Sequence, residues 1–386
     1  MKKATRTTSL FLSRTVCFVL FALVFSISCR KGVEQKALKD FQQVNLVDNN
    51  GAYGATHQDA TLINAWGLAW APSGIAWVNS QAGHVSELYD KDGAPLRKIN
   101  IPSPVDTIGG NPTGIVFNGT TDFTISNGKP GLFFFVGVDG VFSGWNGTAG
   151  NNALRIKNGP PPTSFTGLTS ATNGGANFLY AANFGAGKID VWDKNLAPVS
   201  MSFKDPFLPS GYSPFNIQLV GTWLVVLYAK VGPDGRDQAG EGLGFVSIFN
   251  TDGSFIKRFA SRGPLNAPWG VVQAPPAFFE DNDANDTQSN DHGGNSGKGK
   301  NGDDDRKNNQ PTILIGNFGD GHINAYSLDG EFLGQLKAHG KTIVIDGLWA
   351  LSFPPATATA IDPNRLYFTA GPNHEQNGLF GYLIKQ

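Results

Sequence analysis

The stretch Asn64-Ala65-Trp66-Gly67-Leu68 joins a polar turn to a glycine and an apolar strand, and this pattern recurs along the chain. The later copies are Asn111-Pro112-Thr113-Gly114-Ile115, Phe165-Thr166-Gly167-Leu168, Pro214-Phe215-Asn216-Ile217, Pro268-Trp269-Gly270-Val271 and Asp346-Gly347-Leu348-Trp349. From Gly67 the landmark residues follow at spacings of 47, 53, 49, 54 and 77, with Asn216 in place of the fourth glycine. The last spacing is long because it contains the insertion 280–309. A near-constant period of this length indicates a repeat architecture.

Each repeat contains short strand candidates separated by turn residues. In the first repeat the strands are 67–70, 75–79, 84–89 and 96–101, and the turns between them carry glycine. Glycine tolerates the positive φ angles that tight hairpins need. Four antiparallel strands per repeat are typical of a propeller blade, so six copies predict an all-β, six-bladed β-propeller with four-stranded antiparallel blades.

The two ends of the chain predict how the ring closes. The sixth repeat offers three strands, at 348–353, 366–370 and 379–384, and a further strand candidate lies at 41–47. We expect this N-terminal strand to pair into the last blade as its outer strand, which removes the open edge between the first and last blades. The propeller domain would then span 41–386. A weak helix candidate precedes it at 36–43.

The first 28 residues resemble a lipoprotein signal peptide. Four basic residues precede an apolar run at 16–27, which is too short to span a bilayer, and the run ends in Ser26-Ile27-Ser28-Cys29. We expect cleavage before Cys29, a lipid on that residue, and a tether over 29–40. The alternative is an ordinary secretory signal in which Cys29 occurs by chance.

The composition limits the partners of the mature chain. Cys17 lies in the predicted signal, so Cys29 alone remains and no intrachain disulfide is possible. Without the four signal cations, 26 basic residues stand against 31 acidic ones, a formal charge of −5, and no basic stripe is present. Nucleic acid is therefore excluded as a partner. We expect a monomer in the bacterial cell envelope, held to the membrane by the lipid. Arg30-Lys31-Gly32 lacks the acidic run of some surface-exported lipoproteins, which favours the periplasm.

Several motifs resemble an uncharacterised family of exported bacterial propeller-like proteins, some of which end in PEP-CTERM sorting tails. The motifs are NPTGIVFNGT (111–120), APWGVV (267–272), IGNFGDGHINAY (315–326), IDGLWALSF (345–353) and LYFTAGPNHEQNGLFG (366–381). The resemblance covers roughly 44–386, although this chain ends without a sorting helix. It implies a six-bladed propeller of the NHL or lactonase-like kind and implies no established activity.

Polar residues at the starts of the inner strands are candidate ligands for a cation. They are Asn64, Asn111, Asn216, Asn266 and Asp346. Their oxygen atoms could converge at the channel mouth on Ca²⁺, as in gluconolactonase-type lactonases, where the metal polarises the lactone carbonyl. The alternative is that each asparagine caps its own turn through its side chain.

Two longer loops are further candidates. The loop 230–244 in the fourth repeat carries Asp234, Arg236, Asp237 and Glu241, and a loop longer than its neighbours on a rigid scaffold often binds ligands. The insertion 280–309 contains no large apolar side chain, and we expect it to be disordered. A loose Ca²⁺ loop within it is the alternative.

Two functions follow from these features. The first is a lipid-anchored binding or scaffold module that presents one face of the propeller to a protein, peptide or glycan. The alternative is a Ca²⁺-dependent, lactonase-like hydrolase at the channel mouth. The absence of nucleophile, zinc-protease and phosphate-loop motifs favours the binding module.

Overall fold

The computed structural model describes Met1 and residues 35–280 and 311–386. The predicted signal peptide, the lipidation of Cys29 and nearly all of the insertion 280–309 therefore lie outside the described residues. The described residues 35–280 and 311–386 belong to one compact unit. No helix within the described ranges is long and apolar enough to cross a membrane.

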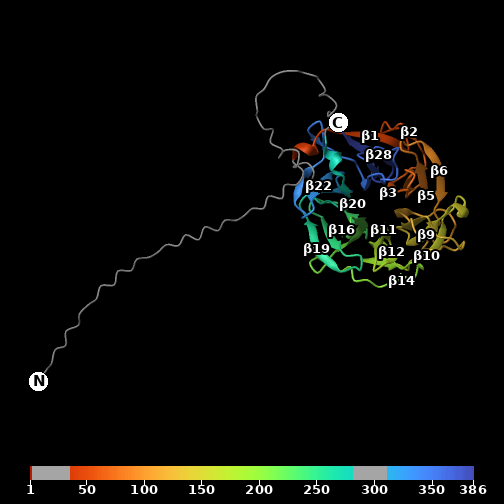
Figure 1. The fold of residues 1–386 in the computed structure, drawn as a ribbon, viewed down its shortest axis with the longest axis horizontal. Coiled ribbons are helices and arrows are strands. Elements are labelled where there is room, and N and C mark those ends of the chain that lie inside the picture. The colour runs from red at the N-terminus through yellow and green to blue at the C-terminus, as the bar shows by residue number, and fades with distance from the viewer. Residues whose placement is uncertain (2–34, 281–310) are drawn as a thin grey trace, which may run out of the picture. The chain divides into compact units, whose positions relative to one another are not determined.

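The described chain forms a six-bladed β-propeller, as the repeats predict (Figure 1). Blade one contains β3 (Ala65–Trp70), β4 (Ala76–Ser80), β5 (Val85–Tyr89) and β6 (Pro95–Asn100). Blade two contains β7 (Pro112–Phe117), β8 (Phe133–Gly137), β9 (Val141–Trp145) and β10 (Leu154–Asn158). Blade three contains β11 (Phe165–Asn173), β12 (Ala176–Asn183), β13 (Lys188–Trp192) and β14 (Pro198–Val199). Blade four contains β15 (Tyr212–Val220), β16 (Trp223–Val231), β18 (Gly244–Phe249) and β19 (Phe255–Ser261), with β17 (Asp237–Gln238) beside β16. Blade five contains β20 (Pro268–Ala274), β21 (Thr312–Asn317), β22 (Ile323–Ser327) and β23 (Phe332–Gln335).

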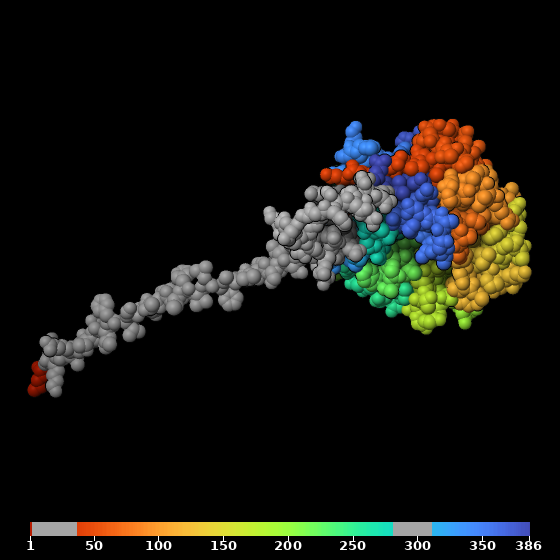
Figure 2. Space-filling model, turned by 45° about the horizontal axis from the view of Figure 1, so that its top comes forward, coloured from red at the N-terminus to blue at the C-terminus, as the bar shows by residue number. Residues whose placement is uncertain are grey.

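The sixth blade closes the ring as predicted. It contains β26 (Leu348–Ser352), β27 (Leu366–Ala370) and β28 (Leu379–Lys385), and β1 (Phe41–Asp48) pairs antiparallel with β28 as its outer strand. The short strand β2 (His57–Gln58) adds to β1 in parallel. A separate hairpin joins β24 (Lys337–Ala338) to β25 (Lys341–Thr342). Figure 1 shows the blades following one another around the ring in chain order, and in Figure 2 the colour passes from orange through yellow to green along one side of the molecule.

The helix candidate at 36–43 is wrong. A single 3₁₀ turn, η1 (Gln35–Leu38), precedes β1, and the other short helices are η2 (Gly147–Ala149) and η3 (Pro276–Phe279). Phe41 explains the difference, because its fully buried ring stacks on Phe278 at 4.8 Å between ring centroids. The strand pairing of β1 and this contact with the fifth blade outweigh the weak local preference for helix.

The landmark glycines let the inner strands approach one another around the channel. A Cβ on Gly67 would lie 2.2 Å from the Thr113 carbonyl oxygen of blade two, and one on Gly114 would lie 2.5 Å from the Leu168 nitrogen of blade three. A register shift marks the same place in each inner strand, and in blade six it lies between Leu348 and Leu351. Ala350, rather than Gly347, therefore occupies the glycine position of the sixth copy.

The core is divided among the interfaces between blades. Six buried apolar clusters each join neighbouring blades, and a seventh fills the centre of the ring. Aromatic pairs such as Trp77 and Phe133, whose ring centroids lie 3.9 Å apart, connect successive blades. The blades thus form a rigid frame that holds the loops around the channel.

Candidate functional site

A tryptophan plug fills the centre of the channel. Trp66, Trp269 and Trp349 each come from the position just before the landmark residue in an inner strand. Trp66 and Trp349 stack with ring centroids 3.5 Å apart, and Trp269 meets Trp349 edge-on at 5.9 Å. A hollow of about 50 Å³ lies deeper along the inner strands, lined by residues such as Gly67, Asn216 and Ser352. Among the described residues, the larger hollow of the channel lies at its mouth.

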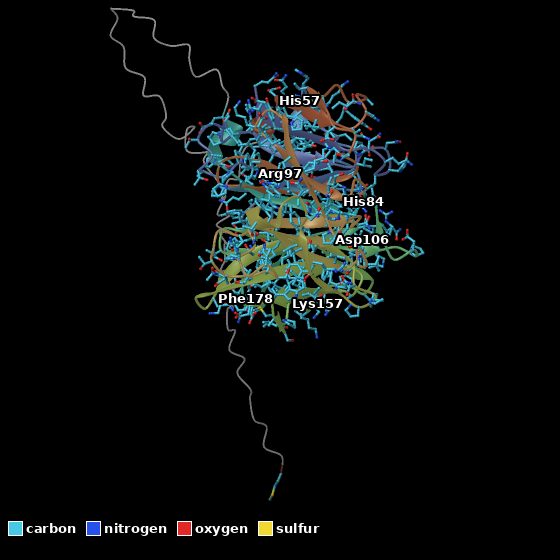
Figure 3. The ribbon with its side chains drawn as sticks, turned by 90° about the vertical axis from the view of Figure 1, so that its right-hand side faces the viewer. His57, His84, Arg97, Asp106, Lys157 and Phe178 are labelled. Carbon is cyan, nitrogen blue, oxygen red and sulfur yellow. The ribbon has the colours of Figure 1, made fainter. Side chains whose placement is uncertain are left out.

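The mouth contains a pocket of about 310 Å³ built by loops from five blades. Its lining residues are Trp66, Gln81, Val138, Ser164, Thr166, Phe184, Phe215, Gly235, Arg236, Asp237 and Glu375. Figure 3 views the ring from its edge, with His84 of the turn before β5 on one side and Phe178 of β12 on the other. Gln81 precedes the same turn as His84, so the mouth lies on the His84 side. The volume suits a small ligand or one side chain of a partner.

A chain of hydrogen bonds crosses the mouth. The amide of Gln81 donates to Asn111 at 3.2 Å, and the amide of Asn64 donates to Gln81 at 3.1 Å and to Glu375 at 2.8 Å. Glu375 in turn forms an ion pair with Arg236 of the blade-four loop. Loops of blades two, one, six and four are thereby linked across the opening.

Glu375 is presented by an unusual backbone turn. Asn373, His374 and Glu375 have φ angles of 55°, 54° and 66°. The left-handed region costs L-residues roughly 1–2 kcal/mol each, so three in succession store strain. The turn is held because the Asp346 carboxylate accepts from the Asn373 N–H at 2.8 Å and the Gly371 carbonyl accepts from the Glu375 N–H at 3.0 Å. Strain concentrated at a pocket is a reason to assign function to the residue it positions.

Asp237 lies beside this ion pair. Burial and, to a smaller extent, the neighbouring Glu375 carboxylate raise the pKa of Asp237 to about 6, against the opposing effect of Arg236. The two carboxylates and one guanidinium give the mouth an excess of negative charge. The side chain of Arg236 is 60% exposed and that of Glu375 is 20% exposed. Solvent therefore screens their attraction, and the ion pair is weak.

The five predicted cation ligands do not form one cluster. Asn64 and Asn111 are linked through Gln81, and the Asn64 oxygen also accepts from the Trp349 indole N–H at 2.8 Å. Asn216 donates to the Trp269 carbonyl at 2.7 Å, which ties blade four to blade five. Each of these asparagines is occupied by protein partners.

The remaining two predicted ligands also have separate partners. The Asn266 oxygen accepts from the Gly240 N–H at 2.6 Å, and the exposed Asp346 supports the turn that carries Glu375. Across the described ranges, no group of three or more His, Cys, Asp or Glu side chains is arranged to hold a metal.

The blade-four loop contributes part of the pocket. Arg236 and Asp237 line it, whereas Asp234 accepts from the Arg236 N–H within the loop turn and Glu241 is exposed outside the lining. Glu375 was not predicted as a site residue. It lies in the motif 366–381, but nothing in that string signals three successive left-handed residues.

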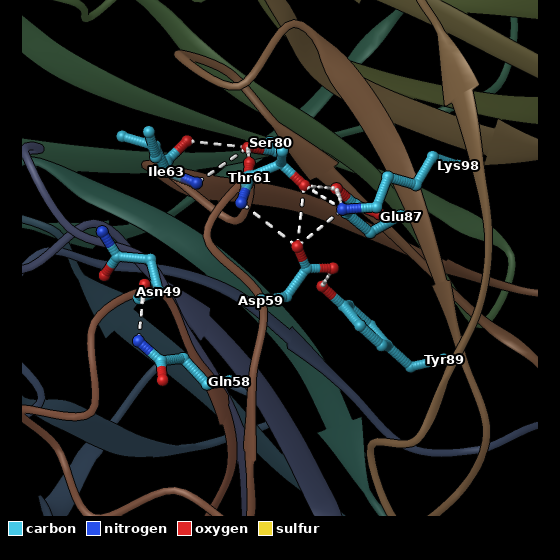
Figure 4. Close-up of polar contacts among 9 residues, drawn as sticks. All are labelled: Asn49, Gln58, Asp59, Thr61, Ile63, Ser80, Glu87, Tyr89 and Lys98. Carbon is cyan, nitrogen blue, oxygen red and sulfur yellow. Dashed lines mark hydrogen bonds and ion pairs between the residues drawn. The ribbon is translucent and has the colours of Figure 1, made fainter.

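A second polar cluster lies in blade one, with two buried carboxylates and an exposed lysine (Figure 4). Lys98 donates to Asp59 at 2.7 Å and lies 3.4 Å from Glu87, while Thr61 bonds both carboxylates. Burial, with a smaller contribution from the Asp59 carboxylate, raises the pKa of Glu87 to about 7, although the hydrogen bond from Thr61 and the charge of Lys98 oppose the shift. Burial also acts to raise the pKa of Asp59, but hydrogen bonds from Lys98 and Thr61 outweigh it, and the pKa is lowered. Tyr89 donates to Asp59 at 3.2 Å.

The fold and the mouth define the chain as a six-bladed β-propeller whose channel is filled by tryptophans at its centre and has a pocket at its mouth. No family model matches it. Uncharacterized protein R648 of Acanthamoeba polyphaga mimivirus is 32% identical over 359 residues, which cover 89% of this chain and 80% of that protein. Uncharacterized protein L690 of the same virus is 31% identical, covering 89% and 86%. The chain belongs to the family of these two proteins, which lends no support to the expected bacterial membership or to PEP-CTERM tails.

Solved structures resemble the chain in fold alone. A streptogramin B lyase structure is 11% identical with a TM-score of 0.49, covering 90% of this chain and 97% of that one. A gluconolactonase from Xanthomonas campestris is 12% identical with a TM-score of 0.44, covering 83% and 86%.

Proposed function

We propose that this protein is a binding propeller whose mouth pocket receives a cationic group of a protein or peptide partner. The observation that carries the proposal is the composition of the pocket: Asp237 and Glu375 share it with one cation, Arg236. Two carboxylates and one guanidinium leave the pocket with an excess negative charge, which attracts a cationic group of a ligand.

The aromatic lining supports the same ligand class. Trp66, Phe184 and Phe215 line the pocket, and aromatic rings attract ammonium and guanidinium groups. Lysine and arginine side chains combine such a group with an apolar stem. Most glycans carry no cation, so a protein or peptide fits the pocket better. In the structure the guanidinium of Arg236 is the cation beside Glu375. A cationic ligand would compete with Arg236 for this carboxylate.

The test is a calorimetric titration of the full-length protein with Nα-acetyl-lysine methylamide. The neutral norleucine and the acidic glutamate derivatives serve as matched ligands. We expect only the lysine derivative to bind, with Glu375→Gln weakening it and Arg236→Ala strengthening it by removing the competing cation. Affinity should rise from pH 5 to pH 7, because the pKa of Asp237 is raised to about 6 and its carboxylate forms in that range.

An exposed glutamate supplies the control. Glu331→Gln, in blade five and outside the pocket, should leave the titration unchanged. Equal binding of the norleucine and lysine derivatives would contradict the cation preference. Binding that survives both Glu375→Gln and Phe215→Ala would place the ligand elsewhere and contradict the pocket assignment.

We further propose that Cys29 carries a lipid and anchors the propeller in a cell envelope, facing the periplasm. The support is the sequence Ser26-Ile27-Ser28-Cys29 after an apolar run, together with the basic residues before it. Mass spectrometry of the mature N-terminus tests this proposal. An acylated Cys29 is expected, and an unmodified N-terminus at another residue would contradict it. The alternative hydrolase gains no supporting observation from the described residues, since each asparagine among its candidate ligands is hydrogen-bonded to protein groups.

A further inference from the structure

Blade three has an unusually short outer strand. Its fourth strand, β14, has two residues, whereas the fourth strands of the other blades have between four and eight. β14 pairs only with Val191 and Trp192 of β13. Along Lys188–Asp190, no described strand pairs with the outer side of β13. An open strand edge of this kind presents backbone groups to any extended chain.

A large groove lies at this edge. It has a volume of about 980 Å³, and its lining includes Phe165, Trp192, Met201 and Phe203 beside the residues of β13. The loop 159–163, which contains three prolines, forms another part of the wall. Lys157 marks the same region near the outer edge of the ring in Figure 3. The groove is separate from the mouth pocket and shares no lining residue with it.

The chain itself explains why the fourth strand is cut short. After β14 it runs toward blade four, where Asp205 is fixed by Ser247 of β18 at 2.5 Å and by Arg258 of β19 at 2.7 Å. Arg258 also forms an ion pair with the same carboxylate. This buried anchor pulls the segment away from β13, so the outer position beside Lys188–Asp190 stays open.

The charge of the groove identifies the kind of partner. Lys157, Lys188 and Lys204 line it, together with Asp190 and Asp205. Asp190 is bonded to Lys188 at 2.6 Å, and Asp205 is neutralised by Arg258. Within the described residues no carboxylate pairs with Lys157 or Lys204, and both are exposed. Two unpaired cations beside an apolar groove complement an acidic segment that also carries apolar residues.

We propose that the open edge of β13 binds an extended acidic peptide segment as an added strand. Backbone hydrogen bonds to Lys188–Asp190 would provide affinity, as in other strand-addition complexes. Successive residues of a strand face opposite sides. The side chains of the peptide would therefore point alternately into the groove and toward Lys157 and Lys204.

The test measures fluorescence anisotropy of a labelled Glu-Val-Glu-Val-Glu amide with the full-length protein. We expect binding that weakens as salt rises, and binding about tenfold weaker in the variant Lys157→Glu/Lys204→Glu. The matched control is Lys129→Glu/Lys341→Glu, which reverses two exposed lysines outside the groove and should change affinity less than twofold. Thermal melts confirm that both variants are folded.

A peptide with N-methyl groups on alternate residues probes the strand geometry. The methylated peptide keeps its side chains but loses the N–H donors along one of its two edges. Methylation of the edge that faces β13 should therefore abolish binding, whereas methylation of the opposite edge should not. Equal affinity for a Lys-Val-Lys-Val-Lys amide, absence of acidic-peptide binding at millimolar concentration, or unchanged affinity in the groove variant would overturn the proposal. Self-association abolished by Lys157→Glu/Lys204→Glu would also overturn it, by identifying a second copy of the chain as the occupant.

Discussion

Replacing Glu87 with glutamine should change how the stability of the propeller depends on pH. Glu87 lies on β5 with 1% of its side chain exposed, and it shares Lys98 with Asp59. Burial raises the pKa of its carboxyl from 4.5 to about 7, so the folded protein favours the protonated form. Glutamine has the shape of the protonated side chain and cannot ionise.

The sign and size follow from proton linkage. Because the folded pKa is above the unfolded value, the stabilisation from Glu87 is fully present below pH 4.5 and is lost as the pH rises through 7. A shift of one pKa unit corresponds to about 1.4 kcal/mol, so this group alone should remove roughly 3 kcal/mol of unfolding free energy across that window. Asp59 has the opposite dependence, since its lowered pKa weakens the fold only at more acidic pH.

Urea unfolding at pH 5, 6, 7 and 8 measures the effect. We expect the free energy of unfolding of the natural protein to fall as the pH rises, and Glu87→Gln to fall much less. Glu331→Gln, at an exposed site, controls for loss of one carboxylate and should follow the natural protein. The same pH slope in the natural protein and in Glu87→Gln would refute the reasoning.

Three further predictions concern closure, the plug and metal. Phe41→Ala should cost about 3–5 kcal/mol in urea unfolding, because it empties a fully buried site of the closing strand, whereas Phe207→Ala at a 71% exposed site should cost little; similar costs for both would contradict this view of closure. Asn64→Ala should cost about 1–3 kcal/mol by leaving the buried Trp349 indole N–H without its acceptor, and an unchanged melting temperature would be inconsistent with it. Millimolar Ca²⁺ should leave the melting temperature unchanged, because the candidate asparagines are already hydrogen-bonded to protein groups. A rise in melting temperature that Asp346→Ala abolishes would instead support the Ca²⁺-dependent hydrolase.

Much of the fold could be predicted from the sequence because each blade is a local unit. The turn glycines and alternating strands give bounds for β27 that match the structure, and the three strands of the last repeat, which lack an outer partner, indicate ring closure by β1. The sixth landmark was misplaced at Gly347 because a register shift, which depends on pairing with β27, moves the position to Ala350.

The site was predicted only in part. Arg236 and Asp237 belong to a loop whose length differs from its neighbours, and sequence alone reveals that difference. Glu375 belongs to a turn stabilised by Asp346 and Gly371, and its partner Arg236 is 139 residues away. No local pattern encodes a contact of that separation.

The sequence by itself determined the repeat, the blade count, the strand order and the closing strand, because these follow from short-range turn chemistry and hydrophobic alternation. The tertiary structure decided what lies at the axis. It stacked the tryptophans into a plug, occupied the candidate asparagines with partners from other blades, and brought Glu375 to Arg236 across the mouth. These outcomes depend on how six separate inner strands converge, and convergence is a property of the closed ring rather than of any one repeat.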